Sequence, residues 1–270
     1  MTQAAIEAVG EGRLRVRLSD RTYVVTAARP ESDAFWRDAA AGRWENETFR
    51  FIDAVTETPG AVLLDVGAWI GPVALYASPR VSRVIALEPD PVARGELTAN
   101  VEANAPNVEI WNAAIDNTPG ELKLYAAQGL GNSETSSIGE GEAIIVKTIT
   151  FADIESAAGE DARVVLKVDI EGHEYRIMDA LIAFAKRRRA SVHLSLHPRS
   201  FWNDRRKQTN WLAARRETVD ATLAAITRLS EVGPVMMSGT GLPATRSEVL
   251  GKVLWKRRPK NFSVEVRAPH

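Results

Sequence analysis

The sequence predicts an α/β protein whose strands form a doubly wound, mainly parallel sheet. Three observations support this fold class. Short apolar runs alternate with stretches of helical character along most of the chain. The run at residues 61–66 stops at a glycine turn, and Pro72 then occupies the position of a first helical residue. About 20 residues later, the run at residues 84–87 ends in Glu88, a spacing at which an acid can bind a ribose diol.

The composition fits a folded chain with a substantial core. Its 270 residues suffice for one large α/β domain or two small ones, and 45% of them are apolar. The net charge of −1 argues against attraction to nucleic acid or to a membrane surface. The absence of cysteine excludes disulfides, thiolate zinc sites and cysteine nucleophiles. Neither a signal-peptide pattern nor a membrane-length apolar stretch occurs, so we expect a cytoplasmic protein; nothing indicates its oligomeric state.

The first part of the chain is predicted to be an extension of the sheet domain. Residues 13–27 alternate between apolar and polar side chains, as a β-hairpin does. Residues 31–57 have helical periodicity with an aromatic stripe, and Gly42 divides them into two helices. We expect this stripe to dock on the sheet domain; the alternative is a lid whose Trp44 or Glu47 contacts a ligand. The predicted division is residues 1–58 for the extension and residues 59–270 for the sheet domain.

From residue 61 onward, strands and helices alternate. The predicted core strands are residues 61–66, 84–87, 108–115, 163–169 and 191–197, followed by two final strands at 234–238 and 261–268. The predicted helices are residues 72–79, 91–104, 151–158, 174–187 and 211–229. Strands at residues 121–125 and 143–148 bracket the polar segment 128–142. We expect this segment, too polar to pack, to be either a mobile loop that closes over substrate or a solvated connector.

Polar residues stand at the carboxyl ends of five predicted strands. They are Asp65, Glu88, Asn112, Asp169 and His197. Parallel strands bring these ends to one edge of the sheet, where α/β sheets bind ligands. A dinucleotide is disfavoured there, because Asp65 replaces the first glycine of the dinucleotide fingerprint and its carboxylate would repel a pyrophosphate. The sequence also has no Gly-Lys-Ser/Thr loop for phosphates.

A positively charged nucleoside without phosphates fits these residues better. S-adenosylmethionine is such a ligand, with an adenine, a ribose diol, a sulfonium and an α-ammonium group. We expect Glu88 to accept hydrogen bonds from the ribose, Asn112 and its neighbours to meet the adenine, and Asp65 to face the amino-acid end. The predicted cofactor-binding residues are Asp65, Gly67, Ala68, Gly71, Glu88, Asn112, Ala113 and Asp169.

Four segments resemble the FkbM family of class I methyltransferases. They are residues 64–71, 86–91, 112–114 and 166–174, the last with the distinctive form Lys-x-Asp-x-Glu-Gly-x-Glu. The resemblance spans residues 45–198, and Trp69 departs from it, because the family usually has asparagine there. It implies a Rossmann-like, seven-stranded, mainly parallel sheet whose last strand is antiparallel. It also implies S-adenosylmethionine as the methyl donor and hydroxyls of sugars or natural products as the usual acceptors.

Methylation of a neutral alcohol needs a base that takes its proton. The predicted catalytic residues are Asp169, Glu171, His173 and His197. Asp169, Glu171 and Glu174 could instead hold Mg²⁺, which prefers oxygen ligands. Carboxylates at a helix start also favour the helix dipole, so we expect no metal. His193 lies deeper in the same strand as His197 and is predicted to belong to the core.

The sequence therefore predicts an S-adenosylmethionine-dependent O-methyltransferase that acts on a hydroxyl of a small molecule, sugar or glycan. The alternatives are an RNA- or protein-directed methyltransferase and a non-catalytic module that binds S-adenosylmethionine. The basic runs at residues 186–189 and 256–258 are expected to be solvated faces, because the net charge is balanced. We therefore expect neither a nucleic-acid nor a membrane partner.

Overall fold

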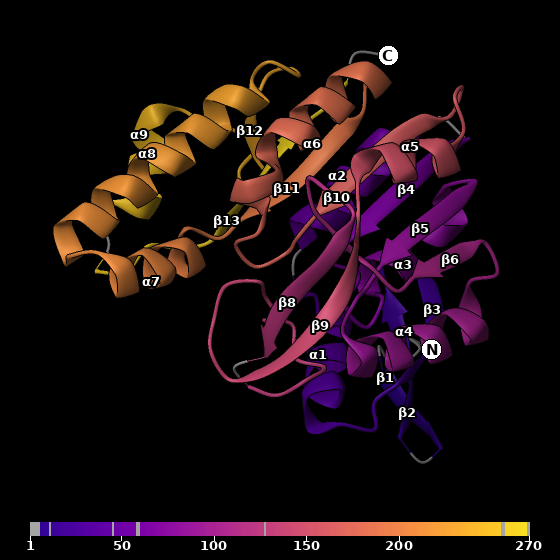
Figure 1. Cartoon of the computed structure of the whole chain (residues 1–270). Helices are drawn as coiled ribbons and strands as arrows, with labels where there is room; N and C mark the ends of the chain where they lie inside the picture. Colours follow the sequence, from indigo (N-terminus) through magenta and orange to yellow (C-terminus); the bar gives the residue numbers. More distant parts are fainter. Residues whose placement is uncertain are drawn as a thin grey trace.

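A seven-stranded sheet forms the centre of the molecule (Figure 1). The structure is a computed structural model that describes residues 6–10, 12–44, 46–57, 60–126, 128–254 and 257–268. In spatial order, the strands are β12 (Met236–Met237), β13 (Phe262–Val266), β11 (Ser191–Leu196), β10 (Arg163–Val168), β4 (Ala61–Val66), β5 (Arg83–Leu87) and β6 (Val108–Trp111). Among the described strands of this sheet, only β13 runs in the direction opposite to the others. The predicted mainly parallel sheet with an antiparallel last strand is confirmed.

Strands β4 and β10 lie in the middle of the sheet. All six residues of β4 are buried, as expected for a parallel strand that is covered on both faces. The two strands pair in register, so that Asp65 lies beside Lys167 and Val66 beside Val168. Their carboxyl ends therefore reach the same edge of the sheet, and the loops that follow them meet there.

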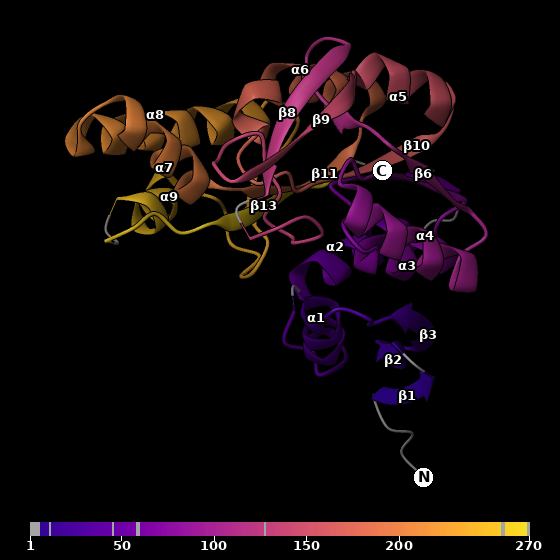
Figure 2. The same cartoon turned by 60° about the horizontal axis from the view of Figure 1, so that its bottom comes forward.

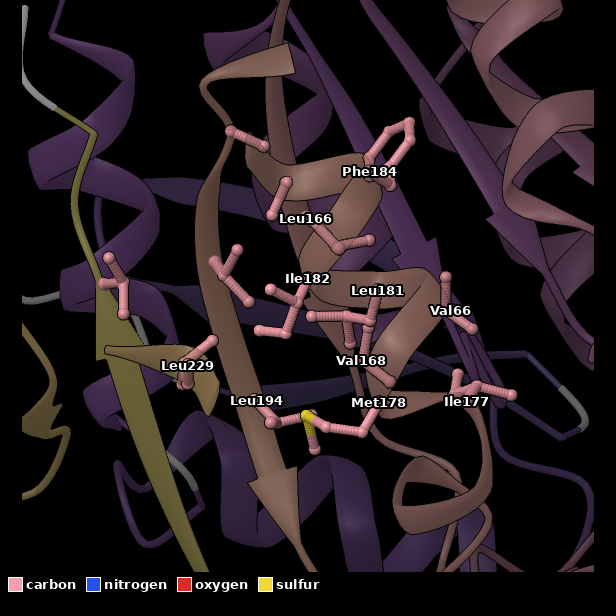
Figure 3. Close-up of a cluster of buried hydrophobic side chains, with 14 of the residues drawn as sticks. Val66, Leu166, Val168, Ile177, Met178, Leu181, Ile182, Phe184, Leu194 and Leu229 are labelled. Carbon is pink, nitrogen blue, oxygen red and sulfur yellow. The ribbon is translucent and has the colours of Figure 1, made fainter. Parts of the chain in front are cut away.

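Helices cover both faces of the sheet. One face packs against α5 (Phe151–Ala158), α6 (Glu174–Arg188), α8 (Trp211–Leu229) and α9 (Arg246–Val253). The other face packs against α2 (Asn46–Thr56), α3 (Pro72–Ala77) and α4 (Pro91–Asn104). Figure 3 shows Met178 of α6 beside Leu194 of β11, and Ile177 of α6 near Val66 of β4. Burial of each such side chain is worth roughly 1.5–3 kcal/mol, which makes this two-sided cover the main support of the fold.

The N-terminal extension is larger than the predicted hairpin. Strands β2 (Arg13–Leu18) and β3 (Arg21–Thr26) form that hairpin, and β1 (Ile6–Gly10), which the sequence did not predict, adds a third strand. Two helices follow as predicted, α1 (Pro30–Ala40) and α2. Asn100 and Asn104 of α4 bond to the backbone of β3, which holds the extension beside α4 (Figure 2). The proposed boundary between residues 58 and 59 lies outside the described residues.

A small second sheet projects from the carboxyl edge of the first. It contains β7 (Ala114–Ile115), β9 (Glu142–Ile149) and β8 (Gly120–Ala126) in that order. The prediction of one strand over residues 108–115 is wrong, because the chain leaves the central sheet after Trp111. Residues 114–115 then pair with β9 instead of β5. The break turns residues 112–113 into a connection at the ligand edge.

The C-terminal part contains more helix than the sequence predicts. The structure adds α7 (Pro198–Gln208) and α9, while β12 has only two of the five residues expected. Pro198 ends β11 as predicted, but it also occupies the first turn of α7, where its missing N–H costs nothing. Lys256 of the second basic run lies outside the described residues. Among the helices that the structure describes, none is long and apolar enough to cross a membrane.

Candidate active site

Two adjoining cavities lie at the carboxyl edge of the central sheet. The first encloses about 620 Å³ of empty space, partly open to solvent, and lies between the ends of β4 and β5 and the second sheet. The second encloses about 720 Å³, also partly open, and reaches Phe35 and Trp44 of the extension. Five residues line both cavities, namely Gly67, Trp69, Ser133, Asp169 and Glu171. The edge predicted to bind ligand is therefore hollow.

Glu88 stands on the wall of the first cavity, at the end of β5. One carboxylate oxygen accepts the backbone N–H of Trp69 and the other that of Asp90, each at 2.8 Å. Burial raises the pKa of Glu88 to about 7, although these two hydrogen bonds act in the opposite direction. Each carboxylate oxygen has a second lone pair, so Glu88 can still accept hydrogen bonds from a diol. These two acceptor oxygens fit the hydroxyl donors of a ribose.

The rest of the first cavity is largely apolar. Ala113, Ile115, Leu122 and Leu124 line it, and two of them come from β8. A slot of small and branched side chains suits the faces of a flat base. Asn112, predicted to meet the adenine, is instead exposed and accepts a hydrogen bond from Arg94 at 2.7 Å. Ala113 is therefore the member of this pair that the structure places at the site.

The glycine turn holds the two strand ends together. Gly67 has a φ of 80°, and a side chain there would overlap the carbonyl oxygen of Asp169, so the loops after β4 and β10 can meet only at a glycine. Ala68 lines the second cavity. Gly71 precedes α3 with a φ of 92°, and a Cβ there would lie 2.6 Å from Leu97. Its role in the structure is packing against α4, rather than lining a cavity.

Asp65 does not face the ligand edge as expected. It is fully buried, and in the described structure it lines neither cavity. Its side chain lies on the α3 side of β4, where Lys167 Nζ approaches Oδ1 at 3.2 Å and donates a 2.7 Å hydrogen bond to the carbonyl of Gly67. Burial raises the pKa of Asp65, and Lys167 partly offsets that effect. Asp65 thus braces the lysine and the glycine turn from behind.

Three carboxylates surround His197, which is 4% exposed. Nδ1 lies 3.2 Å from Glu174, and Nε2 lies 3.3 Å from Glu171 and 3.4 Å from Asp169. Burial alone would lower the pKa of His197, but the three carboxylates outweigh it and raise the pKa well above its usual value. His197 is therefore an imidazolium at neutral pH, and it fixes the two carboxylates that line both cavities.

The same cluster has the dimensions of a cation site. Ligand atoms of Asp169, Glu171 and His197 lie within 4.8 Å of one another, a spacing that a divalent ion could bridge. The imidazolium already supplies a positive charge between these carboxylates, and a metal would have to displace its proton. His197 therefore balances the charge of these carboxylates in this arrangement, and the expectation of no metal stays a prediction.

His173 lies apart from this cluster, on the wall of the first cavity. Nδ1 lies 2.7 Å from Ser137 Oγ, and Nε2 lies 3.5 Å from Asp116. Burial lowers the pKa of His173, so the ring is neutral at physiological pH. His193 is also neutral, because burial lowers its pKa to about 4, and its Nε2 lies 3.4 Å from the Thr48 hydroxyl. The prediction that His193 is a core residue agrees with this placement.

The polar segment 128–142 packs on the first cavity, contrary to the expectation that it is too polar to pack. Asp90, which caps α4, accepts a 2.7 Å hydrogen bond from the backbone N–H of Gly131. Trp69 Nε1 and Arg29 Nη2 donate to the carbonyl of Gly131 at 2.8 and 2.9 Å. Ser136 donates to the carbonyl of Glu171 at 2.7 Å. These partners are far apart in the sequence, and no local signal identified Arg29 or this docking.

The fold and the site define a class I methyltransferase. The strand order, the antiparallel β13 and the acidic residue after β5 are the features of that class that the structure contains. A family model described as the methyltransferase FkbM domain matches residues 65–224, more than half of the chain. The chain therefore belongs to the FkbM methyltransferase family, and its methyl donor is S-adenosylmethionine.

Other similarities are more limited. The AMB antimetabolite synthetase AmbE of Pseudomonas aeruginosa is 35% identical over 125 residues, which cover 38% of this chain. The matched part spans only 6% of that protein's length. Among solved structures, the methyltransferase FkbM of Methylobacillus flagellatus KT is 14% identical, with a TM-score of 0.37 over 61% of this chain and 42% of that one. A TehB-like SAM-dependent methyltransferase of Corynebacterium glutamicum is 11% identical, with a TM-score of 0.43 over 88% and 96% of the two chains.

Proposed function

We propose that the protein methylates a hydroxyl group of a small molecule, sugar or glycan. The observation that carries this proposal is the position of Asp169 and Glu171, which line both cavities at the end of β10. In this proposal, Glu88 binds the ribose in the first cavity. The carboxylates therefore lie where the reactive end of the cofactor and the acceptor would meet. A cytoplasmic location remains part of this proposal.

The cofactor is proposed to lie across both cavities. Its ribose would bind Glu88, and its adenine would enter the slot formed by Ala113, Leu122 and Leu124. Its amino-acid end would occupy the second cavity, beside Ala68 and the first residues of α3, Pro72 and Val73. Lys167 lines that cavity and could attract the carboxylate of the amino acid. Asp65 would act on this end indirectly, through Lys167 and Gly67.

Glu171 is the proposed base. S-adenosylmethionine supplies an activated methyl group and leaves as S-adenosylhomocysteine. Burial raises the pKa of Glu171, so it holds a proton more readily than an exposed glutamate does. Glu171 takes the acceptor proton while the acceptor oxygen forms its bond to the methyl carbon. Lys167 and His197 outweigh burial and lower the pKa of Asp169, which stays ionised and orients the acceptor hydroxyl. His197 holds both carboxylates in place.

The test is product formation with purified protein, S-adenosylmethionine and a panel of hydroxylated acceptors. Mass spectrometry should show one added methyl group on an acceptor oxygen, together with an equal amount of S-adenosylhomocysteine. The variants Glu171→Gln and Asp169→Asn should bind the cofactor and form little product. Methylation of nitrogen, RNA or protein alone, or binding without turnover on every acceptor, would contradict the proposal.

A further inference from the structure

We propose that the indole ring of Trp69 binds the sulfonium of the cofactor through a cation–π contact. The protein would then hold the charged methyl donor more tightly than the neutral product, S-adenosylhomocysteine. This inference rests on the proposed placement of the cofactor across the two cavities. It adds a residue that selects between substrate and product, a property that the placement alone does not require.

The position of the sulfur follows from the shape of the site. Sulfur joins the adenosine part of the cofactor to its amino-acid part. If each part occupies one cavity, the sulfur lies among the five residues that line both. Trp69 is the aromatic residue of that group, and Asp169 and Glu171 are its acids. A cation at this junction therefore meets two carboxylates and one π system.

Trp69 is held rigidly at the junction. Its backbone N–H donates to Glu88 at 2.8 Å, and its Nε1 donates to the carbonyl of Gly131 at 2.8 Å. The ring of Phe35 packs edge-to-face against it, with centroids 4.6 Å apart. The first bond fixes the backbone and the other two contacts fix the ring, so the indole can meet a ligand without losing much further side-chain freedom.

The backbone of Trp69 is strained. Its φ of 50° lies in the left-handed region, which asparagine tolerates and large side chains avoid. The chain places an indole at this position, although the conformation disfavours a large side chain. Strain of this kind points to a functional reason for the side chain.

The charge at sulfur disappears when the methyl group leaves. A cation–π contact therefore favours the donor and is lost in the product, whereas hydrogen bonds to the ribose and adenine are common to both. The contact does not speed methyl transfer, because it weakens as the positive charge is neutralised. Its effect is a weaker hold on the product, which would limit product inhibition.

The experiment compares dissociation constants of S-adenosylmethionine and S-adenosylhomocysteine, measured by calorimetry. Trp69→Leu and Trp69→Asn remove the ring, and the asparagine suits the left-handed backbone and protects folding. Both variants should bind S-adenosylmethionine about tenfold more weakly and S-adenosylhomocysteine less than about twofold more weakly. Trp69→Phe keeps a π face but loses the hydrogen bond to Gly131, and it should retain most of the preference for S-adenosylmethionine.

Trp44→Leu is the matched control, because Trp44 lines only the second cavity, which would hold the part common to both ligands. It should change both dissociation constants by the same factor. Equal losses for both ligands in the Trp69 variants would overturn the inference and leave the proposed function intact. Failure of the unmodified protein to bind either ligand would instead overturn the proposed function.

Discussion

His197 and Glu174 make two contacts through a single carboxylate oxygen. Oε1 of Glu174 accepts the backbone N–H of His197 at 2.6 Å and lies 3.2 Å from Nδ1 of the same residue. The other oxygen accepts the backbone N–H of Gly172 at 2.8 Å. Glu174 therefore joins the end of β11 to the loop after β10. The side chain that it orients, His197, in turn fixes the carboxylates of Asp169 and Glu171.

The first prediction concerns the charge of His197. Its pKa is raised in the folded protein, so its contribution to stability is complete below the ordinary value of about 6.5 and is lost as pH rises through the raised value. Nitrogen NMR should show an imidazolium at pH 7. The stability difference between wild type and His197→Gln, measured by urea unfolding, should shrink under alkaline conditions. A neutral ring at pH 7 would contradict the charge assigned to His197 among its three carboxylates.

The second prediction concerns Glu174, which is fully buried. Replacing it with glutamine leaves the imidazolium of His197 with one less negative partner in a buried site. Glu174→Gln should lower the pKa of His197. It should also lower the free energy of unfolding by about 3 kcal/mol. Glu231→Gln removes an acid with a 45% exposed side chain, which pairs with Lys186, and should change stability by less than about 1 kcal/mol. Equal effects of the two substitutions would count against the role assigned to Glu174.

The third prediction concerns the proposed base. Glu171→Gln should lower kcat by about 10²–10⁴-fold, because general acid–base catalysis contributes that much. S-adenosylmethionine should bind only a few-fold more weakly, because the sulfonium loses one carboxylate but still meets Asp169 and Trp69. His173→Gln is the comparison, because His173 lines the first cavity and lies apart from the carboxylate cluster. A larger loss of kcat in the histidine variant would move the base to His173.

The fourth prediction concerns Glu88 and protons. Its pKa of about 7 means that about half of the free protein carries a proton on Glu88 at pH 7. Ribose hydroxyls favour the ionised carboxylate, so binding S-adenosylmethionine should release up to about half a proton. Calorimetry in buffers of different ionisation enthalpy measures this number directly. Release should disappear in Glu88→Gln, and proton uptake by the wild type would show that the sign is wrong.

The sequence predicted the strands better than the directions of their side chains. The runs at residues 61–66 and 84–87 are bounded by glycine and proline, so their ends lie close to those observed in β4 and β5. The sequence of β4 does not reveal which face of the strand meets a ligand. Asp65 was therefore expected at the ligand edge, although it lies on the face covered by α3. Asn112 was placed wrongly because the chain leaves the sheet just before it.

The remaining omissions have a common physical cause. Docking of residues 128–142 depends on long-range partners, such as Asp90 for Gly131 and Glu171 for Ser136. The segment itself carries only a polar composition, which resembles that of a solvated loop. Helix α7 likewise has just two buried residues, Pro198 and Trp202, and thus a weak apolar period. A segment that is held by hydrogen bonds to distant residues, or that buries few side chains, has only a weak pattern of apolar residues in its own sequence.

The last prediction tests that docking through two glycines of the same loop. Gly129 and Gly131 have φ values of 89° and 85°, so alanine strains the backbone equally at both. A Cβ at Gly129 meets nothing within 4 Å, whereas one at Gly131 would overlap Arg29 and lie 2.6 Å from Val92. Gly131→Ala should therefore undock the loop, raise KM for S-adenosylmethionine several-fold and speed proteolysis within residues 128–142. Gly129→Ala should introduce the same backbone strain and leave KM for S-adenosylmethionine nearly unchanged. Similar KM values for the two variants would show that the loop does not help to hold the cofactor.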